Sequence, residues 1–367
     1  MKLLFQKSDI LNGLQIASKA VPTHTTMPIL QCILLRAQNH RITLTANDMD
    51  MGIETDIEGE IIEEGIIALD AKFFLDIIRK MPDNQISIET DENYNTFITC
   101  EKSHFNIVGK SGDDFSYLPE VEKNDEIIIS QFTLKEVIRQ TIFSIAENDA
   151  NKIMGGELFE VNGDRLKIVS LDGHRISIRQ TDLRNSYDPI KVIVPGKTLN
   201  EINKILSGDA DKDVTISFSD KHIIFEFDNT IVVSRLIEGQ YFNVDQMISL
   251  DYETKVTVQK RDFLDCIDRA TLLVKEGDKK PIIIDINNNH MELRINSVNG
   301  SMNEIVDIRQ EGADLMIGFN PKFMIDALRA IDDEKIDIYL VSSKTPCIIR
   351  DSDNSYLYLI LPVNFVH

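Results

Sequence analysis

The stretch that decides the fold is residues 71–82, which read AKFFLDIIRKMP. Phe74, Ile77 and Ile78 recur at the spacing of one helical face, so the stretch predicts an amphipathic helix. Lys72 and Arg79 fall on another face. The pattern returns 125 and 250 residues later, where Lys72, Asp76 and Arg79 become Lys197, Glu201 and Lys204, and then Lys322, Asp326 and Arg329. An apolar strand precedes each first lysine, and we therefore predict three copies of one unit.

Helical spacing predicts six helices, two in each copy. They are Lys7–Ala20, Ala71–Pro82, Thr133–Ala146, Gly196–Leu206, Lys260–Lys275 and Asn320–Ile331. Alternating apolar and polar residues predict many half-buried antiparallel strands between the helices. The strands expected are Ile29–Arg36, Arg41–Ala46, Gln85–Thr90, Thr96–Cys100, Glu126–Ser130, Leu158–Val161, Arg165–Ser170, Ile176–Gln180, Lys191–Val194, Val214–Phe218, His222–Phe227, Thr230–Arg235, Pro281–Ile286, Met291–Asn296, Leu315–Phe319, Lys335–Leu340 and Tyr356–Leu361. The expected fold is α+β, with three repeated domains that each hold an antiparallel sheet and two helices.

Two short acidic joins, Ser111–Asp125 and Glu238–Glu253, separate the copies. They carry the aromatic pairs Phe115 with Tyr117 and Tyr241 with Phe242, and they are too short and too apolar for flexible linkers. We therefore expect three domains in a fixed arrangement, at residues 1–120, 121–245 and 246–367. The positions between the helices also correspond, and they are Ile42, Leu44 and Asp48, then Leu166, Ile168 and Asp172, then Leu293, Ile295 and Asn299.

Composition places the chain among intracellular globular proteins. Its 367 residues are 43% hydrophobic, which is enough for ordinary cores and excludes a disordered or collagen-like chain. No apolar run approaches the ~18 residues of a membrane span. The first residues, Met1 to Asp9, are too charged for a secretory signal, so we expect a cytoplasmic location.

Charge is unevenly distributed along the chain, whose net charge is −21. The six predicted helices hold 15 Lys and Arg against 8 Asp and Glu, a net of +7, which leaves −28 for the rest. An ordinary solvated helix face explains any single helix, but three equivalent basic helices favour one shared basic lining. The Debye length of about 8 Å keeps acids on the far side of the helices screened from that lining. Such a face would hold the DNA backbone without reading sequence.

Two other classes of function stay open on the residues alone. A hydrolase or lyase would use His174 as general base and Asp172 to orient it, although no nucleophile elbow, metal triad or phosphate loop accompanies them. An acidic scaffold without DNA would explain the repeats but not the recurring basic helices. The four cysteines are widely spaced, and buried thiols are expected at Cys32, Cys266 and Cys347. We expect no metal site and no cofactor.

Short motifs along the whole chain resemble the beta subunit of bacterial DNA polymerase III, the sliding clamp. These motifs are Met27-Pro28-Ile29-Leu30, Asp172-Gly173-His174-Arg175, Val192-Ile193-Val194-Pro195, Ile317-Gly318-Phe319-Asn320 and Leu361-Pro362-Val363. The resemblance implies a non-catalytic processivity factor that forms a head-to-tail dimeric ring, with helices lining the hole. It implies that the ring encircles duplex DNA without sequence specificity. The implied partners are a second copy of the chain, double-stranded DNA, a clamp loader, the replicative polymerase and other proteins with a clamp-binding motif, and no membrane.

The resemblance also implies one partner-peptide pocket between the second and third domains. Its positions here are Met154, Leu171, Gly173, His174, Arg175, Ile176, Phe242, Gln246, Met247, Asn320, Phe323, Leu359, Leu361, Pro362, Val363 and Asn364. An apolar slot with a polar rim suits a short motif with Gln and Leu or Phe anchors. Phe242, Gln246 and Met247 depart from the usual Pro, Arg and Val of the family, so we expect a remodelled slot.

Two further sets of residues follow from the charge pattern and the resemblance together. The DNA-facing set is His24, Lys72, Arg79, Lys80, Lys135, Arg139, Lys152, Lys197, Lys204, Lys322 and Arg329. The dimer-interface set is Lys72, Phe105, Leu272 and Leu273, where simple core packing is the alternative for the two leucines.

Overall fold

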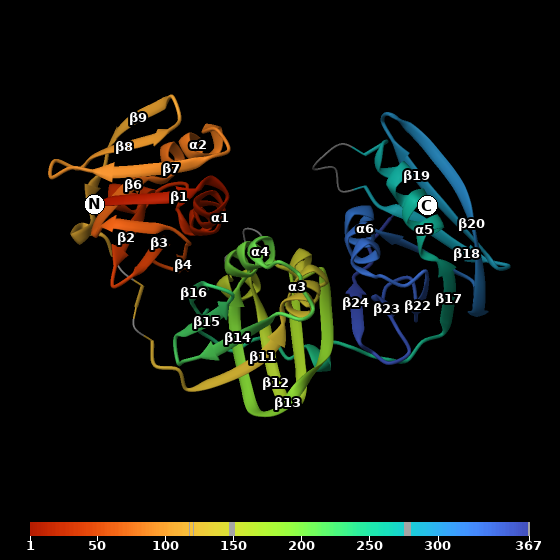
Figure 1. Cartoon of the computed structure of the whole chain (residues 1–367). Coiled ribbons are helices and arrows are strands. Elements are labelled where there is room, and N and C mark those ends of the chain that lie inside the picture. Colours follow the sequence, from red (N-terminus) through yellow and green to blue (C-terminus); the bar gives the residue numbers. More distant parts are fainter. Residues whose placement is uncertain (117, 120, 147–150, 275–279, 366–367) are drawn as a thin grey trace. The chain divides into compact units, whose positions relative to one another are not determined.

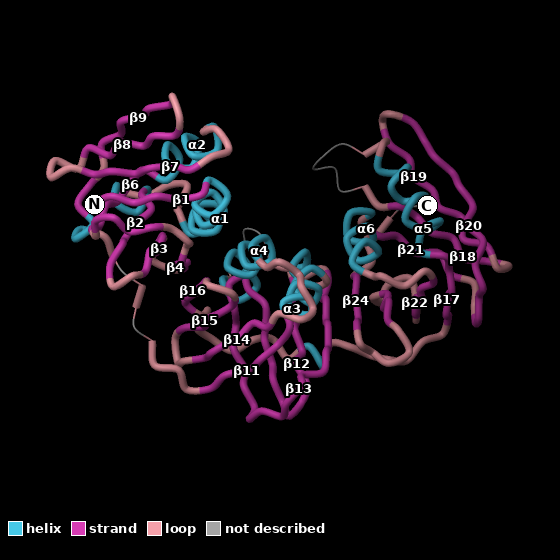
Figure 2. Tube along the Cα trace, viewed as in Figure 1, coloured by secondary structure: helices cyan, strands magenta, loops and turns pink. Residues whose placement is uncertain are grey.

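The computed structural model describes residues 1–116, 118–119, 121–146, 151–274 and 280–365. Three antiparallel sheets run through them (Figures 1 and 2). The five-stranded sheet has the order β5 (Glu60–Glu63), β1 (Lys2–Gln6), β7 (Gln85–Thr90), β8 (Asn95–Cys100) and β9 (Ser103–Val108). The nine-stranded sheet has the order β10 (Lys110–Ser111), β6 (Gly65–Asp70), β2 (Cys32–Gln38), β3 (Arg41–Asn47), β4 (Met51–Asp56), β16 (Thr230–Arg235), β15 (His222–Phe227), β14 (Asp213–Phe218) and β11 (Asp125–Ser130). The ten-stranded sheet has the order β12 (Gly156–Leu171), β13 (Arg175–Pro195), β24 (Tyr356–Ile360), β23 (Cys347–Arg350), β22 (Lys335–Leu340), β17 (Thr254–Gln259), β20 (Gly300–Gly312), β19 (His290–Ser297), β18 (Ile282–Asn287) and β21 (Leu315–Phe319).

The described residues also form six α-helices and six short 3-10 helices. The α-helices are α1 (Lys7–Ala17), α2 (Ala71–Lys80), α3 (Gln131–Arg139), α4 (Gly196–Ile205), α5 (Lys260–Thr271) and α6 (Pro321–Ala330). The 3-10 helices are η1 (Ser18–Ala20), η2 (Pro28–Gln31), η3 (Gly112–Asp114), η4 (Ile142–Ser144), η5 (Lys152–Gly155) and η6 (Val244–Gln246). Helices and antiparallel sheets in this arrangement confirm the expected α+β class.

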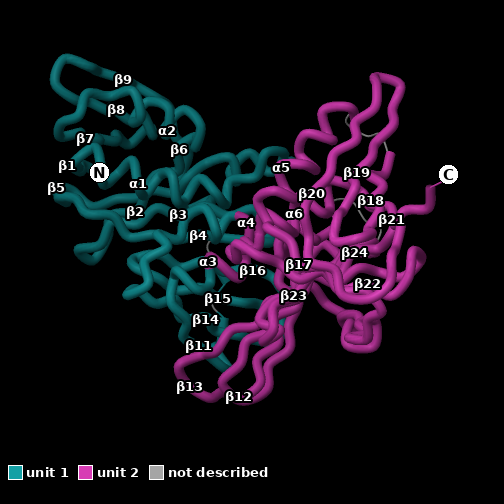
Figure 3. Tube along the Cα trace, turned by 90° about the vertical axis from the view of Figure 1, so that its right-hand side faces the viewer, with its two compact units in different colours: residues 1–134, 201–236 teal, residues 135–200, 237–367 magenta. Residues whose placement is uncertain are grey.

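Two compact units divide the chain, and Figure 3 colours them separately. Unit 1 holds residues 1–134 and 201–236, and unit 2 holds residues 135–200 and 237–367. The five- and nine-stranded sheets belong to unit 1, and the ten-stranded sheet belongs to unit 2. The predicted domain limits after residues 120 and 245 stay a prediction.

Helices α2 and α6 begin where a capping side chain accepts a hydrogen bond from one of the first backbone N–H groups. Asp70 accepts a hydrogen bond from the Phe73 backbone N–H at 2.9 Å and so caps α2. Asn320 accepts one from the Lys322 N–H at 3.0 Å, and Pro321 follows it at the first helical position of α6. The apolar face of each helix then packs into the core of its unit.

Several predicted boundaries were too long. The helix expected over Thr133–Ala146 ends at Arg139, because the Thr141 hydroxyl donates to the Val137 carbonyl at 2.7 Å and the chain continues as η4. The helix expected to reach Lys275 ends at Thr271, and Lys275 lies outside the described residues. The first three residues of the expected strand Ile29–Arg36 were assigned wrongly, since residues 29–31 lie in η2 and the strand begins at Cys32.

The predicted burial of Cys32, Cys266 and Cys347 is confirmed, since all four cysteines are buried and free. Within the described residues, no group of three or more His, Cys, Asp or Glu could hold a metal ion. No helix among them is long and apolar enough to span a membrane. Tyr117, one of the aromatic residues expected in the first join, lies outside the described residues.

Candidate functional site

A cavity of about 320 Å³ lies in unit 2 where β13 pairs with β24, and we call it the β13–β24 pocket. Its lining residues are Met154, Leu171, Gly173, His174, Arg175, Ile176, Phe242, Met247, Pro346, Leu359 and Leu361. All of them except Pro346 belong to the predicted peptide-binding set. Pro346 directly precedes β23, and no feature of its own sequence neighbourhood indicates the pocket; it arrives there because β23 pairs with β24.

The rim of this pocket is the tight turn that joins β12 to β13. The Asp172 carboxylate accepts hydrogen bonds from the backbone N–H groups of His174, at 2.9 Å, and Arg175, at 3.1 Å. Gly173 has a φ of +83°, a left-handed conformation that glycine adopts without steric cost. The turn leaves the His174 carbonyl free to accept from the Leu361 N–H at 2.9 Å, which fixes β24 against the turn.

Arg175 is a structural anchor behind the pocket wall. Only 8% of the residue is exposed, and its guanidinium donates to Asp172 at 2.9 Å, to Asp326 of α6 at 2.7 Å and to the Phe143 carbonyl. It also stacks 4.4 Å from the centre of the Phe323 ring. Because these contacts join β13, η4 and α6, Arg175 holds the pocket's shape rather than offering a free donor to a ligand.

The same contacts argue against the hypothesis that Asp172 orients His174 as a general base. Both oxygens of the Asp172 carboxylate are committed to the turn and to Arg175. The imidazole of His174 instead lies against the ring of Phe323, with the ring centres 6.1 Å apart. Asp172 therefore does not orient His174 as a general base.

Six predicted pocket residues lie outside the cavity lining: Gln246, Asn320, Phe323, Pro362, Val363 and Asn364. Phe323 supports the wall through Arg175, and Asn320 caps α6. Gln246 is exposed at the end of η6. Val363 donates its N–H to the Gly318 carbonyl at 2.8 Å, so residues 362–364 run beside β21. Their contact with a peptide stays a prediction.

One fully buried acid lies on β12, the strand that also supplies Leu171 to the pocket. Glu157 of β12 is fully buried, and burial raises its pKa well above the ordinary value, with a smaller opposing effect from a hydrogen bond to Thr141. Neighbouring Tyr241 donates its hydroxyl to the Val169 carbonyl at 3.2 Å, and burial raises its pKa as well. Burial therefore favours the protonated form of both groups over the charged form.

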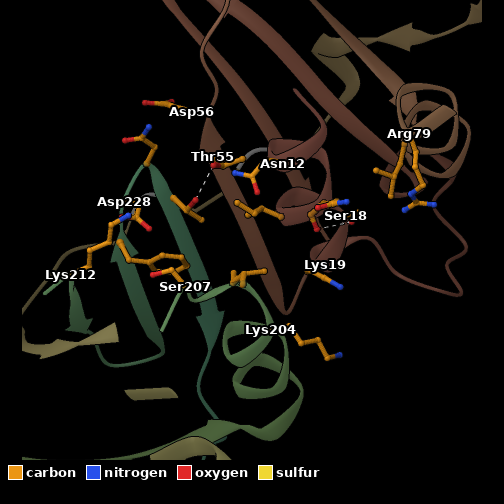
Figure 4. A pocket seen from close by; sticks show the side chains of 17 residues that line it. Asn12, Ser18, Lys19, Thr55, Asp56, Arg79, Lys204, Ser207, Lys212 and Asp228 are labelled. Atoms are coloured by element: carbon orange, nitrogen blue, oxygen red, sulfur yellow. Dashed lines mark hydrogen bonds and ion pairs between the residues drawn. The ribbon is translucent and has the colours of Figure 1, made fainter. Parts of the chain in front are cut away.

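In unit 1, bases from separate helical segments gather around a cavity of about 710 Å³ (Figure 4). Lys19 of η1, Arg79 of α2 and Lys204 of α4 all line it. Asp56 and Asp228 also line it, but their carboxylates pair with Arg41 at 2.8 Å and Lys212 at 3.0 Å. Arg79 and Lys204 belong to the predicted DNA-facing set. Sequence reasoning missed Lys19 and Lys212, although Lys19 lies within a helix already predicted to be basic.

In unit 2, two further members of the DNA-facing set lie together. Arg139 of α3 donates to the backbone carbonyl of Arg329 in α6 at 3.3 Å. Each guanidinium also has an acidic partner, since Arg139 pairs with Glu136 at 2.6 Å and Arg329 pairs with Asp268 at 3.1 Å. Such partly neutralised bases contribute weaker phosphate contacts than unpaired ones, and the same holds for Arg79 and Lys204, which pair with acids of their own helices.

The remaining predicted bases differ in exposure. Six of them are exposed: His24, Lys72, Lys80, Lys152, Lys197 and Lys322. Lys135 is half-buried. The first lysine of α2, α4 and α6 therefore has the same exposed position in each helix, as the repeat predicts.

The predicted dimer residues separate into two kinds. Phe105 is 44% exposed on β9, the end strand of its sheet, and Leu272 is 81% exposed after α5. Leu273 instead packs partly buried against the core of unit 2. Exposed apolar side chains of this size favour an interface with another protein surface.

Comparison with known proteins identifies the family. Models of the DNA polymerase III beta subunit match the chain with the N-terminal domain at residues 1–119, the central domain at 128–243 and the C-terminal domain at 245–364. The chain belongs to the DNA polymerase III beta subunit family. It is therefore a non-catalytic processivity subunit of the sliding-clamp type, and neither the enzyme nor the scaffold alternative applies.

Individual relatives agree over nearly the whole chain. The beta sliding clamp of Staphylococcus epidermidis is 34% identical over 374 residues, which cover 99% of each chain. The solved DNA polymerase sliding clamp of Bacillus subtilis is 32% identical, with a TM-score of 0.94 and 100% of both chains covered. The crystal structure of a candidate DNA polymerase III beta subunit from Eubacterium rectale is 64% identical, with a TM-score of 0.96 and 100% of both chains covered.

Proposed function

We propose that two copies of this chain close head to tail into a ring around duplex DNA, with the helices facing the hole. The domains follow one another near residues 1–120, 121–245 and 246–367. A clamp loader opens and closes the ring, and the replicative polymerase and other partners dock a short peptide in the β13–β24 pocket. The chain acts in the cytoplasm.

The observation that carries the DNA-binding part is the basic cavity of unit 1. Lys19, Arg79 and Lys204 come from three helical segments that are far apart in the sequence. Within the described part of the chain, no ion pair engages Lys19. Duplex DNA carries one charge per about 1.7 Å of its axis, so a surface of this kind attracts the phosphate backbone and loses affinity as salt rises. Backbone contacts position a duplex and leave its sequence unread, as a sliding protein requires.

Peptide docking is supported by the composition of the β13–β24 pocket. Leu171, Ile176, Leu359 and Leu361 give it apolar walls, and flexible methionines adapt its mouth. Because the Arg175 guanidinium is already paired with Asp172 and Asp326, the pocket favours apolar anchors over charged ones.

The experiment that tests the ring is retention on DNA of different topology. The full-length chain, loaded onto nicked circular duplex by a clamp loader, should stay bound at salt concentrations that remove simple electrostatic binders. Cutting the circle once should release it, because a ring slides off a free end. Equal retention on circular and linear DNA would refute encirclement. A circle whose cut ends are blocked by bound protein is the matched control, and it should retain the chain.

A further inference from the structure

A second cavity, of about 310 Å³, lies in unit 1 where β4 pairs with β16, and we call it the β4–β16 pocket. Its lining residues are Asn47, Met49, Asp50, Met51, Gly52, Ser116, Pro119, His222, Val233 and Arg235. Neither the predicted DNA-facing set nor the predicted peptide-binding set includes any of them.

Backbone register makes this cavity the internal-repeat equivalent of the β13–β24 pocket. Met51 pairs with Ser234 across β4 and β16, as Arg175 pairs with Ile360 across β13 and β24. The Arg235 N–H donates to the Asp50 carbonyl at 2.8 Å, in the same way as the Leu361 N–H donates to the His174 carbonyl at 2.9 Å. The two pockets thus rest on one framework.

The turn at the rim is also repeated. The Asp48 carboxylate accepts the backbone N–H groups of Asp50, at 3.0 Å, and Met51, at 2.7 Å, as Asp172 does in the other pocket. Met49 occupies the position of Gly173 and has a φ of +79°. A left-handed methionine is uncommon, and such conformations persist mainly where the surrounding structure or a function requires them. Its side chain is 54% exposed at the mouth of the cavity.

The side chains differ in chemistry at equivalent positions. Arg235 replaces Leu361, His222 replaces Pro346 and Asp50 replaces His174, so the rim holds one arginine and one carboxylate. Met49, Met51 and Val233 keep an apolar wall. In the part of the chain that the structure describes, no ion pair engages the exposed Arg235 guanidinium. Burial lowers the pKa of His222, and the charges of Arg235 and Lys221 lower it further, as expected for a locally positive rim. The Arg235 guanidinium can therefore offer charge-assisted hydrogen bonds to a carboxylate beside the apolar wall.

We propose that the β4–β16 pocket is a second peptide-binding site, which takes a segment of a partner protein that carries an apolar side chain beside a carboxylate. The apolar side chain enters between Met49, Met51 and Val233, and the carboxylate accepts hydrogen bonds from Arg235. The inference rests on the proposed function, because the class of ligand is that of the β13–β24 pocket. The two sites differ in selectivity: Arg175 of the β13–β24 pocket is paired with Asp172 and Asp326, whereas no ion pair among the described residues engages Arg235.

Methyl NMR of the full-length chain, labelled with 13C at the methionine methyl groups, reports on both pockets in one titration. Met49 and Met51 report on the β4–β16 pocket, and Met154 and Met247 report on the β13–β24 pocket. The probe is acetyl-Leu-Phe-Asp amide, and the matched probe carries Asn in place of Asp. We expect saturable shifts of Met49 and Met51 with the Asp probe. The Asn probe and the variant Arg235→Gln should each weaken binding about three- to fivefold, as for a solvent-exposed ion pair.

Matched variants control for nonspecific charge effects. Lys344→Gln removes an exposed positive charge outside the pocket and should leave binding unchanged. Asp50→Asn removes a like charge from the rim and should strengthen binding of the Asp probe. Absence of saturable shifts at Met49 and Met51, or equal binding of both probes by wild type and Arg235→Gln, overturns the proposal. A third probe, acetyl-Gln-Leu-Phe amide, distinguishes failure of the second site from failure of the proposed peptide docking. If Met154 and Met247 respond to it while Met49 and Met51 respond to no probe, only the second site is refuted. If none of the four methionines responds, peptide binding at both pockets is refuted.

Discussion

Arg175 is the residue on which the shape of the β13–β24 pocket depends most. Its guanidinium joins the β12–β13 turn to α6 through Asp172 and Asp326 and is almost wholly buried. Lysine keeps the charge but cannot make the same fork of hydrogen bonds. Sequence spacing alone could not reveal this network, because Asp326 lies 151 residues from Arg175 and also fits the helix repeat as a surface acid.

The variant Arg175→Lys should therefore lower the free energy of unfolding by about 1–2 kcal/mol, because the charge is kept while hydrogen bonds of the buried fork are lost. Urea denaturation of unit 2, followed by circular dichroism, measures this loss. The matched control is Arg184→Lys, an exposed arginine on the same strand, which should change stability by less than about 0.5 kcal/mol. Equal stability of wild type and Arg175→Lys would contradict the anchoring role.

Glu157 makes the free energy of unfolding depend on pH. Its pKa is raised in the folded chain, so the native state keeps a proton that the unfolded state releases above the ordinary carboxyl range. The contribution of Glu157 to the free energy of unfolding is fully present below the pKa that the group has in the unfolded chain. It is lost as pH rises toward the pKa that the group has in the folded chain. The loss approaches about 1.4 kcal/mol per pH unit within that window.

Replacing Glu157 with Gln removes that titration. The variant Glu157→Gln should gain stability relative to wild type as pH rises from 5 to 8, and the difference should be smallest at pH 5. Urea unfolding at several pH values measures it. A difference that does not change with pH would show that Glu157 is ionised in the folded chain.

At the scale of elements, the helices could be predicted well and the strands less completely. The six apolar stripes located the six α-helices of the described residues, because each stripe is buried in a core. Strand β20 was not predicted, because most of its residues are exposed or half-buried and its sequence therefore shows little alternation of apolar and polar residues. Strands β12 and β13 continue where short segments were expected, since their long antiparallel ladder runs past Gly163 with only a local shift in register. The pocket could be predicted only from the family resemblance, because its walls come from segments more than 180 residues apart.

The exposed end of α5 and the end strand β9 make the dimer interface testable. Leu272→Asp places a charge on a residue that is 81% exposed, so folding should be unaffected. A charge buried in an apolar interface is costly, and the mass in solution should shift from dimer to monomer at micromolar concentration. Sedimentation measures the mass. Leu250→Asp, at an apolar residue that is 50% exposed in the second join, is the control and should stay dimeric.

At the scale of the whole molecule, the repeat places one exposed lysine at the start of α2, α4 and α6. The triple variant Lys72→Glu, Lys197→Glu and Lys322→Glu should fold normally and lose DNA retention after loading, with the deficit shrinking as salt rises. Retention on circular DNA across a salt series measures this. Reversal of Lys102, Lys221 and Lys344, which lie on turns, matches the change in net charge and should have a much smaller effect. Equal losses in both triple variants would argue against the helices as the DNA-facing surface.

The acid of α6 forms a different ion pair from the equivalent acids of α2 and α4. Asp76 and Glu201 pair with the base three residues along their own helices, whereas Asp326 has exchanged that partner for Arg175. Met51 occupies the position in β4 that Arg175 occupies in β13, and it is buried. An arginine at residue 51 would lack a free acidic partner on α4, because Glu201 already pairs with Lys204. Converting one copy into the other thus requires two changes together: an arginine in place of Met51 and the release of Glu201 from Lys204.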